Sequence, residues 1–366
     1  MKLGKLKESI LDRSVFKQIH KRNDNILCKP KAGLGYQTLM TGPDTYTSVS
    51  VNTVEGTPFQ AGAMIVPRGI NSLVCSGAVP AGIMVSLTVP EDVEEPEFRK
   101  MIQRIEADCE REGIDLAGGH TQVSANVCQV IAGVTCLGTW SADGQGAGGG
   151  RENSGRHFAP PVREDHGGRA VNGGSGGKAL AAPLAGQSII MTKWAGMSGA
   201  WLLEQEYHEA FVNKYNHHIA HQIQAMDRYF SVRKEAAAAL EQEPCFLYDL
   251  SESGVFGGLW EAARAGNTGL WVDLKKIPIR QEVVELCDFV DINPYKIPSA
   301  GALLIGTEHG ERLADTLNRL GIPAAVIGTF TPGNDRVVAN EDEVRYLEPP
   351  SGREFPVHRM NREPKR

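Results

Sequence analysis

The sequence predicts an α+β protein of two domains, each with helices packed on a mixed or antiparallel sheet. Three observations predict this class. Strand and helix signals alternate along the chain, which is typical of layered α/β architectures. A glycine-rich stretch divides the 366 residues into two parts of ordinary domain size, 1–140 and 187–345. Hydrophobic residues make up 41% of the chain, which is enough for a buried core in each part.

The first part opens with helix and strand signals in turn. The expected elements are a helix over 9–22, a strand over 47–51, helices over 61–76 and 95–111 with a strand over 81–89 between them, and a β-rich stretch over 126–140. The helix over 95–111 is the clearest, because Ile102, Ile105 and Cys109 fall on one face at spacings of three and four. Gly113 then supplies a stop signal. Pro67 should lie at a kink or at a helix start.

The glycine-rich stretch, residues 141–186, holds thirteen of the 41 glycines and almost no bulky apolar side chains. Such a composition cannot bury enough surface to offset its ordering entropy, so we expect a flexible insert or linker. A phosphate-cradling loop is the alternative, but no Gly-Lys-Ser/Thr opens a helix after a strand here. At the other end, residues 346–366 are expected to form a polar, basic tail.

The second part also alternates, with short apolar runs bounded by Gly and Pro. The expected elements are a strand over 188–192, a helical region to about 240, a strand over 245–250, a helix over 254–265, a strand over 268–274, a helix over 281–287, a strand over 300–305, a helix over 308–320 and a last strand over 324–330.

Composition and charge exclude several classes of protein. A net charge of −6 and a pI near 6.0 argue against a nucleic-acid binder. No run approaches the ~18 apolar residues of a membrane span, and no hydrophobic region follows the basic start as in a signal peptide. Seven cysteines, an odd number without a C-x-x-C pair, argue against a zinc ribbon or a disulfide framework. We therefore expect a cytoplasmic protein with reduced cysteines.

Six short blocks, in order, resemble the aminoimidazole-ribonucleotide (AIR) synthetase superfamily, nearest its HypE-like hydrogenase-maturation branch. In the first part they are Val51-Asn52-Thr53, residues 71–80 (NSLVCSGAVP) and Gly118-Gly119-His120-Thr121. In the second part they are residues 248–259 (YDLSESGVFGGL), 299–304 (SAGALL) and 325–328 (AVIG). Each block alone is short, but together they span nearly the whole chain outside the glycine-rich stretch.

The resemblance implies a PurM-like fold. An AIR-synthetase-like N-terminal domain, residues 1–140, would pair its strands with those of a second subunit and close an intersubunit β-barrel. An AIR-synthetase-like C-terminal α/β domain, residues 187–345, would pack against it. ATP is expected in the N-terminal domain near the dimer interface, and a substrate between the domains. The implied partners are a second copy of the chain and a small molecule or another protein.

The matching motifs also imply site residues. The nucleotide-binding candidates are Asn52, Asn71, Gly118, Gly119, His120, Thr121 and Lys193. The catalytic candidates are Asp249 and Glu252, the counterparts of the acidic pair before the family's glycine turn. Two alternatives stay open at this point. Glu252 would cap the helix that begins near Gly254, and Lys193 would be an ordinary solvated lysine at a strand end.

The acids that hold magnesium in this superfamily are depleted here. Mg²⁺ is a hard ion that prefers about six oxygen ligands, and carboxylates supply them beside ATP phosphates. The matching positions in this chain carry neutral side chains or histidine, namely Asn52, Ser72, His120 and Gln122. We therefore assign no metal ligand and expect nucleotide binding with weak or absent Mg·ATP catalysis.

Two functions are compatible with these motifs. One is a pseudoenzyme, a homodimer that binds ATP without turning it over. The other is an active ATP-dependent enzyme that phosphorylates a carbonyl or amide oxygen of a small substrate. HypE itself carries a C-terminal cysteine that receives the carbamoyl group, whereas the last cysteine here is Cys287. We therefore expect a relative of HypE that lacks this carrier.

Overall fold

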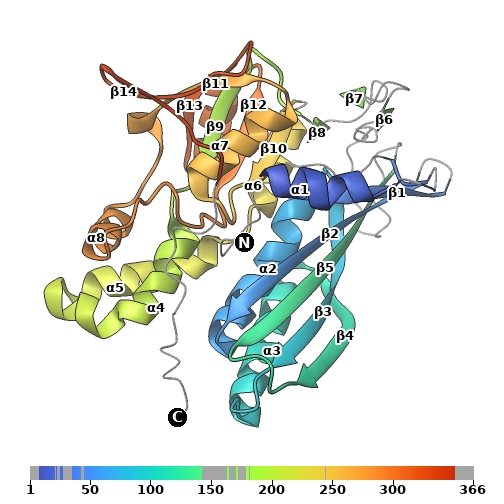
Figure 1. Cartoon of the computed structure of the whole chain (residues 1–366), viewed down its shortest axis with the longest axis vertical. Coiled ribbons are helices and arrows are strands. Elements are labelled where there is room, and N and C mark those ends of the chain that lie inside the picture. Colours follow the sequence, from blue (N-terminus) through green and yellow to red (C-terminus); the bar gives the residue numbers. More distant parts are fainter. Residues whose placement is uncertain are drawn as a thin grey trace.

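Two β-sheets, one from each half of the chain, organise the molecule (Figure 1). The computed structural model describes residues 8–20, 22, 25–27, 35–42, 45–141, 163–164, 170–171, 179–180, 182–243 and 245–350. Among these residues, no helix has the length and apolar character needed to cross a membrane.

The first domain is built on a five-stranded sheet with the order β1-β2-β5-β3-β4. Its strands are β1 Gln37–Gly42, β2 Thr45–Gly56, β3 Val79–Val89, β4 Asp115–Val123 and β5 Val130–Ser141. Neighbours run antiparallel except β3 and β4, which are parallel. Helices α2 (Pro58–Val74) and α3 (Glu95–Glu112) pack on one face of this sheet (Figure 1).

Helix α2 begins with a capping box and runs through a proline. The side chain of Thr57 accepts a hydrogen bond from the backbone of Gln60, and the Gln60 side chain accepts one from Thr57. Pro67 lies inside the helix, so the alternative that the helix starts there is wrong. Thirteen residues of α2 are buried, and this packing outweighs the hydrogen bond that a proline removes.

Other elements of the first domain differ from the predictions in extent. The predicted helix over 9–22 is only α1, Glu8–Ser14, followed by a 3₁₀ turn. Helix α3 has the predicted position and ends at Gly113, whose φ is 62°. Strand β4 is not predicted by the sequence pattern. Eight of its nine residues are exposed, so it lacks the alternation that marks a half-buried strand.

The second domain holds an eight-stranded mixed sheet with the order β15-β14-β11-β13-β9-β12-β10-β8. Its strands are β8 Ala179–Leu180, β9 Ser188–Thr192, β10 Cys245–Asp249, β11 Gly269–Asp273, β12 Leu303–Thr307, β13 Ala324–Thr331, β14 Arg336–Asn340 and β15 Glu343–Tyr346. Its helices are α4 Met197–Lys214, α5 His217–Gln224, α6 Arg233–Gln242, α7 Gly254–Ala265, α8 Gln281–Phe289 and α9 Gly310–Arg319, with the 3₁₀ helix η2 Ala225–Tyr229 between α5 and α6.

Three expectations for this half are corrected by the structure. The strand over 324–330 is not the last, because β14 and β15 follow it. Strand β8 lies inside the segment expected to be a linker, yet it pairs with β10 in the main sheet. A pair of two-residue strands, β6 (Arg163–Glu164) and β7 (Ala170–Val171), lies there too, and most of that prediction falls outside the described residues.

The beginning of the predicted tail region, residues 346–350, is part of the described structure. The backbone N–H of Leu347 donates to the carbonyl of Arg336 at 2.8 Å, so the chain beyond β15 stays against the sheet. Residues 351–366 lie outside the described residues.

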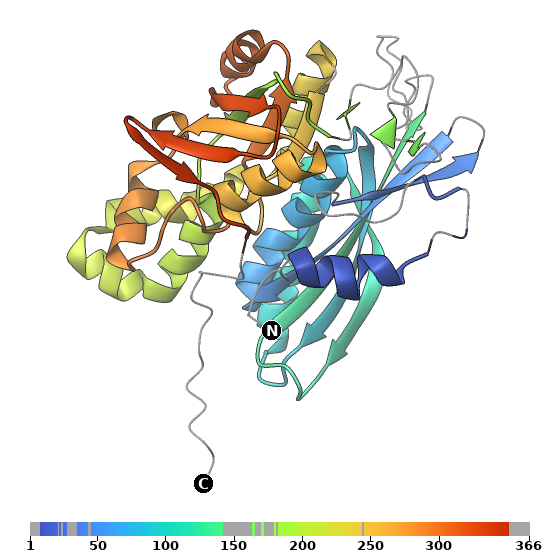
Figure 2. The same ribbon diagram turned by 45° about the horizontal axis from the view of Figure 1, so that its top comes forward.

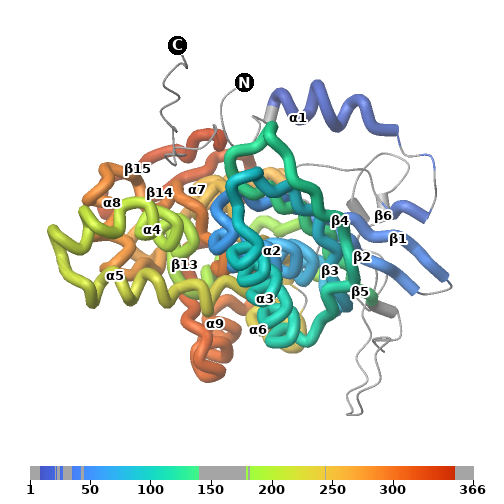
Figure 3. The backbone as a smooth tube through the Cα atoms, turned by 90° about the horizontal axis from the view of Figure 1, so that it is seen from below, coloured from blue at the N-terminus to red at the C-terminus, as the bar shows by residue number. Residues whose placement is uncertain are grey.

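Helix α2 lies between the first sheet and the second domain (Figure 2). The view from below shows α2 and α3 in the middle, with α4 and α5 to one side and the strands of the first sheet on the other (Figure 3). One face of α2 therefore packs on β2 and β5, and another meets β10 and α6. This position makes α2 the element that joins the domains.

Candidate functional site

The carboxylate of Asp249 lies at the junction of the two domains, where β10 ends. Both of its oxygens are buried, and neither has a hydrogen-bond partner within the described part of the chain. Burial raises the pKa of Asp249 to about 6, although the positive charge of Arg68 and the polar side chains of Ser251 and Asn71 oppose the rise. A buried, unpartnered carboxylate is costly, so its retention marks a functional candidate.

The guanidinium of Arg68 faces this carboxylate from α2. It donates to Glu252 Oε1 at 2.5 Å, and only 6% of the Arg68 side chain is exposed. The ion pair connects the middle of α2 to the loop between β10 and α7. Ser253, the residue before α7, makes no side-chain capping hydrogen bond, and Glu252 is directed to Arg68. The structure thus gives Glu252 an ion-pair role, which is compatible with a capping role at α7.

Asn71 fastens the same helix to the second domain. Its amide Nδ2 donates to the Phe230 carbonyl at 2.7 Å, and its Oδ1 accepts from the Val232 N–H at 3.0 Å. The side chain is fully buried. Both of its described hydrogen bonds hold the turn between η2 and α6, so the structure gives Asn71 a role in joining the domains beside Asp249.

Asn52 approaches the junction from the sheet side of α2. Its Nδ2 donates to the Arg68 carbonyl at 3.0 Å and lies 3.5 Å from Ser72 Oγ. Asn52 and Ser72, two positions where the resemblance implies acids, therefore lie beside each other as neutral groups. The structure thus brings Asn52 and Asn71, by way of α2, to the same side of the molecule as Asp249 and Glu252.

The Gly118–Thr121 motif lies elsewhere, on the edge strand β4. Cross-strand pairing places Asn52, Val134, Val85 and Gly119 in one row of the sheet. Asn52 and Gly119, at the two ends of that row, are three strand spacings apart, which is a distance of about 14 Å. Within one subunit, His120 and Thr121 therefore do not join the Asp249 cluster.

Lys193 is held in the interior of the second domain. Its ammonium forms an ion pair with Glu235 and donates to the carbonyls of Tyr229 at 2.8 Å and Ser231 at 2.6 Å. Burial lowers its pKa, and the charge of Glu235 opposes this. The ammonium is thus already satisfied, and neither the phosphate contact nor the solvated strand end expected from the sequence describes it.

Groups of metal ligands are missing from this region. No set of three or more His, Cys, Asp or Glu side chains could hold a metal ion among the residues that the structure describes. Asp249 and Glu252 are two acids, and Arg68 already pairs with one of them. The residues present therefore do not fit a resident magnesium ion, and no chemical step is derived through one.

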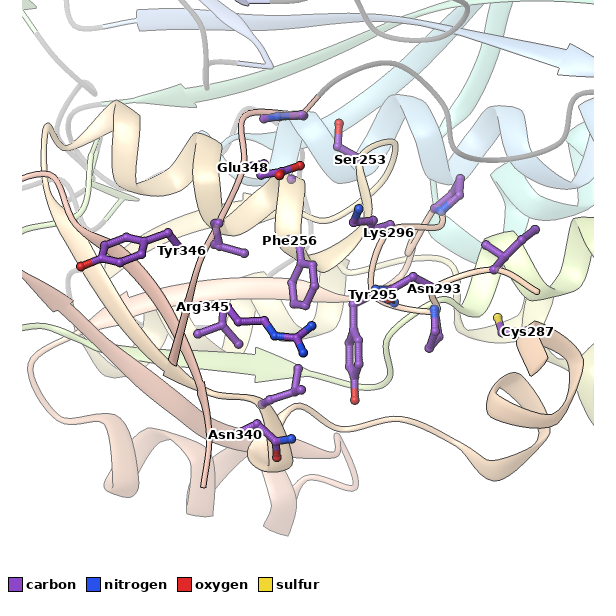
Figure 4. A pocket seen from close by; sticks show the side chains of 18 of the residues that line it. Ser253, Phe256, Cys287, Asn293, Tyr295, Lys296, Asn340, Arg345, Tyr346 and Glu348 are labelled. Carbon is purple, nitrogen blue, oxygen red and sulfur yellow. Dashed lines mark hydrogen bonds between the residues drawn. The ribbon is translucent and has the colours of Figure 1, made fainter. Parts of the chain in front are cut away.

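Arg68 is the member of this cluster that the motif comparison missed. The only local signal is a single charged residue in an apolar helical run, Val66-Pro67-Arg68-Gly69-Ile70. A buried arginine needs an anionic partner, so that signal predicts a partner but cannot identify it. Glu252 also borders a pocket of about 730 Å³ in the second domain (Figure 4).

The chain is similar to known proteins over most of its length. Residues 35–140 match the N-terminal domain of AIR synthase related protein, and residues 185–340 match its C-terminal domain. A putative hydrogenase expression/formation protein of Methanocaldococcus jannaschii is 23% identical over 282 residues, covering 76% of this chain and 72% of that protein. Carbamoyl dehydratase HypE of Rhodobacter capsulatus is 23% identical over 288 residues, covering 79% and 71%.

Solved structures share the fold. HypE in complex with ATP superposes with a TM-score of 0.64 at 16% identity, covering 96% of this chain and 93% of that chain. AaThiL complexed with AMPPCP and TMP gives 0.65 at 15% identity, covering 93% and 96%. A HypE–HypF complex gives 0.62 at 12% identity, covering 86% and 93%. At these identities the likeness concerns the fold.

Proposed function

This chain belongs to the AIR synthase related family in both of its domains, and from that premise we propose that it binds ATP at the domain junction and hydrolyses it weakly or not at all. The membership agrees with the resemblance predicted from the sequence, and the structural neighbours confirm the PurM-like fold. HypE and thiamine-monophosphate kinase, which occur among its relatives, set the family context.

One observation carries the proposal. The junction holds the acidic pair Asp249 and Glu252, while Asn52, Ser72 and His120 are neutral side chains or histidine at positions where the resemblance implies acids. Solved relatives bind ATP or an ATP analogue on the same fold, which supports a nucleotide as the ligand. With so few carboxylates, a divalent ion would be weakly held, and phosphoryl transfer would lose much of its electrostatic stabilisation.

A second candidate function rests on Asp249. A general base works best when its pKa lies near the operating pH, and burial raises the pKa of Asp249 to about 6. An active ATP-dependent enzyme would use this carboxylate to take a proton from a substrate. We rank this function second, because phosphoryl transfer also needs acids that hold magnesium beside the phosphates, and Asn52, Ser72 and His120 supply none at the positions where the resemblance implies them.

We further propose that the protein works as a homodimer through the first sheet. Val51, Met84 and Ile131, on three neighbouring strands, are 69%, 46% and 38% exposed. Apolar side chains gathered on one sheet face favour association. A partner subunit would also supply a second copy of the Gly118–Thr121 motif.

Calorimetric titration with ATP, with and without Mg²⁺, followed by an ADP-release assay, tests the proposal. We expect saturable binding that depends little on Mg²⁺, with almost no ADP released. Sustained turnover abolished by Asp249→Asn would establish the second function instead. Absence of binding under all conditions would refute both functions.

A further inference from the structure

A pocket of about 730 Å³ is lined entirely by residues of the second domain. Its walls come from α7, from the loop over 291–298 and from β14, β15 and residues 347–350 (Figure 4). This volume falls within the range of about 300–1,000 Å³ that is usual for small-molecule sites.

A pair of aromatic rings lines the pocket. Phe256 of α7 and Tyr295 of the loop over 291–298 stack on each other. Their ring centroids are 5.3 Å apart and their planes are 19° from parallel. Both side chains are half-buried, and Figure 4 shows the two rings side by side in the pocket. An aromatic surface that is fixed by packing and still partly exposed favours a flat ligand.

The charged side chains of the pocket are mainly acidic. Five acids line it, namely Glu252, Asp288, Asp291, Glu343 and Glu348. Two bases, Lys296 and Arg345, stand against them, so the lining carries a formal charge of −3 (2 − 5). A cleft lined by one sign of charge concentrates ligands of the opposite sign.

Ion pairs of these side chains reduce the formal charge of the lining to −2, so it stays acidic. Arg345 donates to Glu343 Oε1 at 2.7 Å, which neutralises both, and Glu252 is paired with Arg68. Asp288, Asp291 and Glu348 then face the single charge of Lys296. A triphosphate would be repelled by this lining, which separates the pocket from the nucleotide site proposed at the junction.

We propose that this pocket binds a small organic cation with a flat aromatic ring, such as an aromatic amidine or an N-alkylated heterocycle. The ring stacks on the Phe256–Tyr295 pair, and the positive charge is balanced by Asp291 and its acidic neighbours. Cation–π attraction to the same rings adds to the binding. The proposal does not depend on the nucleotide site, because Phe256, Tyr295 and Asp291, which carry it, are not among the residues assigned to that site.

A series of three probes of equal shape tests the charge preference. Benzamidine is cationic, benzamide is neutral and benzoate is anionic, and each is titrated into the full chain by ligand-observed NMR. We expect saturable binding of benzamidine, at least about fivefold tighter than benzamide, with no binding of benzoate. Equal or tighter binding of benzoate, or no saturable binding of any probe, would overturn the proposal.

Variants locate the binding in this pocket. Tyr295→Leu and Asp291→Asn should each weaken benzamidine at least about threefold, whereas Tyr295→Phe keeps the ring and should retain binding. Asp315→Asn, at an exposed aspartate of α9, is the matched charge control. Unchanged affinity in both Tyr295→Leu and Asp291→Asn would refute the assignment. The same variants are also titrated with ATP. Loss of ATP binding while benzamidine still binds would contradict only the nucleotide proposal.

Discussion

Arg68 and Glu252, which lie 184 residues apart in the chain, meet in an ion pair of 2.5 Å across the domain junction. The pair has an unequal environment, because the Arg68 side chain is 6% exposed and the Glu252 side chain 34%. Arg68 also opposes the burial of Asp249. One buried guanidinium therefore serves two carboxylates of the second domain, and this couples domain packing to the candidate site.

Replacing Arg68 by methionine should destabilise the protein by roughly 1–3 kcal/mol, because Glu252 loses this ion pair and Asp249 loses the charge that opposes its burial. Urea unfolding measures this change. Arg99→Met breaks an exposed pair with Glu95 and should cost less than about 0.5 kcal/mol. Equal costs for the two variants would show that the junction pair is no more important than a surface pair.

Sequence patterns predicted the elements that are determined locally. Helix α7 and strand β9 have the predicted bounds, because glycine and apolar periodicity mark them within a few residues. Strand β4 was not predicted because it forms by pairing with β3, and this pairing is a tertiary contact that the local sequence pattern does not show. Motifs likewise identified Asp249 and Glu252, but could not show that Arg68 joins them.

Two predicted site positions show the same limit. Lys193 follows a strand and resembles a phosphate ligand. Its partner Glu235 lies on α6, within the predicted helical region, but the sequence does not show that this helix packs beside Lys193. The separation of His120 from Asn52 depends on the strand order, in which β5 and β3 intervene. The residue type shows which interactions a side chain can make. Which groups it meets depends on the tertiary packing, which these local motifs do not show.

Asp249 should make stability fall as pH rises. Its pKa is raised from 3.8 to about 6 by burial. Between about pH 4 and 6 the unfolded chain releases this proton while the folded protein holds it, so the unfolding free energy decreases across that window. Above pH 6 the folded protein carries the full cost of burying the Asp249 carboxylate in its charged form, at most roughly 3 kcal/mol.

Asp249→Asn removes this titration. The excess of its unfolding free energy over that of the natural protein should grow between about pH 4 and 6 and then stay level up to pH 7.5, as measured by urea unfolding at several pH values. Asp315→Asn, an exposed change, should leave the pH profile unaltered. A constant difference between Asp249→Asn and the natural protein across this range would contradict the raised pKa.

The two glycines of the β4 motif should differ in their tolerance of alanine. Gly118 and Gly119 have φ values of 145° and 153°, a region that costs other residues roughly 1–3 kcal/mol. A Cβ at Gly119 would lie 1.8 Å from the Val85 carbonyl oxygen, whereas one at Gly118 meets nothing within 4 Å.

Gly119→Ala should therefore cost roughly 3–5 kcal/mol and Gly118→Ala only the backbone strain. Thermal and urea unfolding compare the two variants directly, each serving as the other's control. A similar loss in both would mean that the close approach of β4 to β3 is not maintained in solution.

Lys193→Met should destabilise the protein by roughly 3–5 kcal/mol, because it leaves Glu235 charged and unpaired with 2% of its side chain exposed. The double variant Lys193→Met with Glu235→Leu should recover most of that loss. Urea unfolding gives both values. ATP titration of the double variant should give the affinity of the natural protein, and a large loss there would restore Lys193 as a phosphate ligand.

The outer face of the first sheet should hold two subunits together. Strand pairing places Val51, Thr135 and Met84 in one row across β2, β5 and β3. In a two-fold symmetric interface each substitution acts twice, so Val51→Glu combined with Met84→Glu should convert a dimer into monomers. Sedimentation velocity at micromolar concentration separates these states. Trp271→Glu changes a side chain of the second sheet that is 46% exposed, as Met84 is, and should leave the dimer intact. A natural protein that sediments as a monomer at these concentrations would exclude the intersubunit barrel, and the Gly118–Thr121 motif would then have no route to the junction.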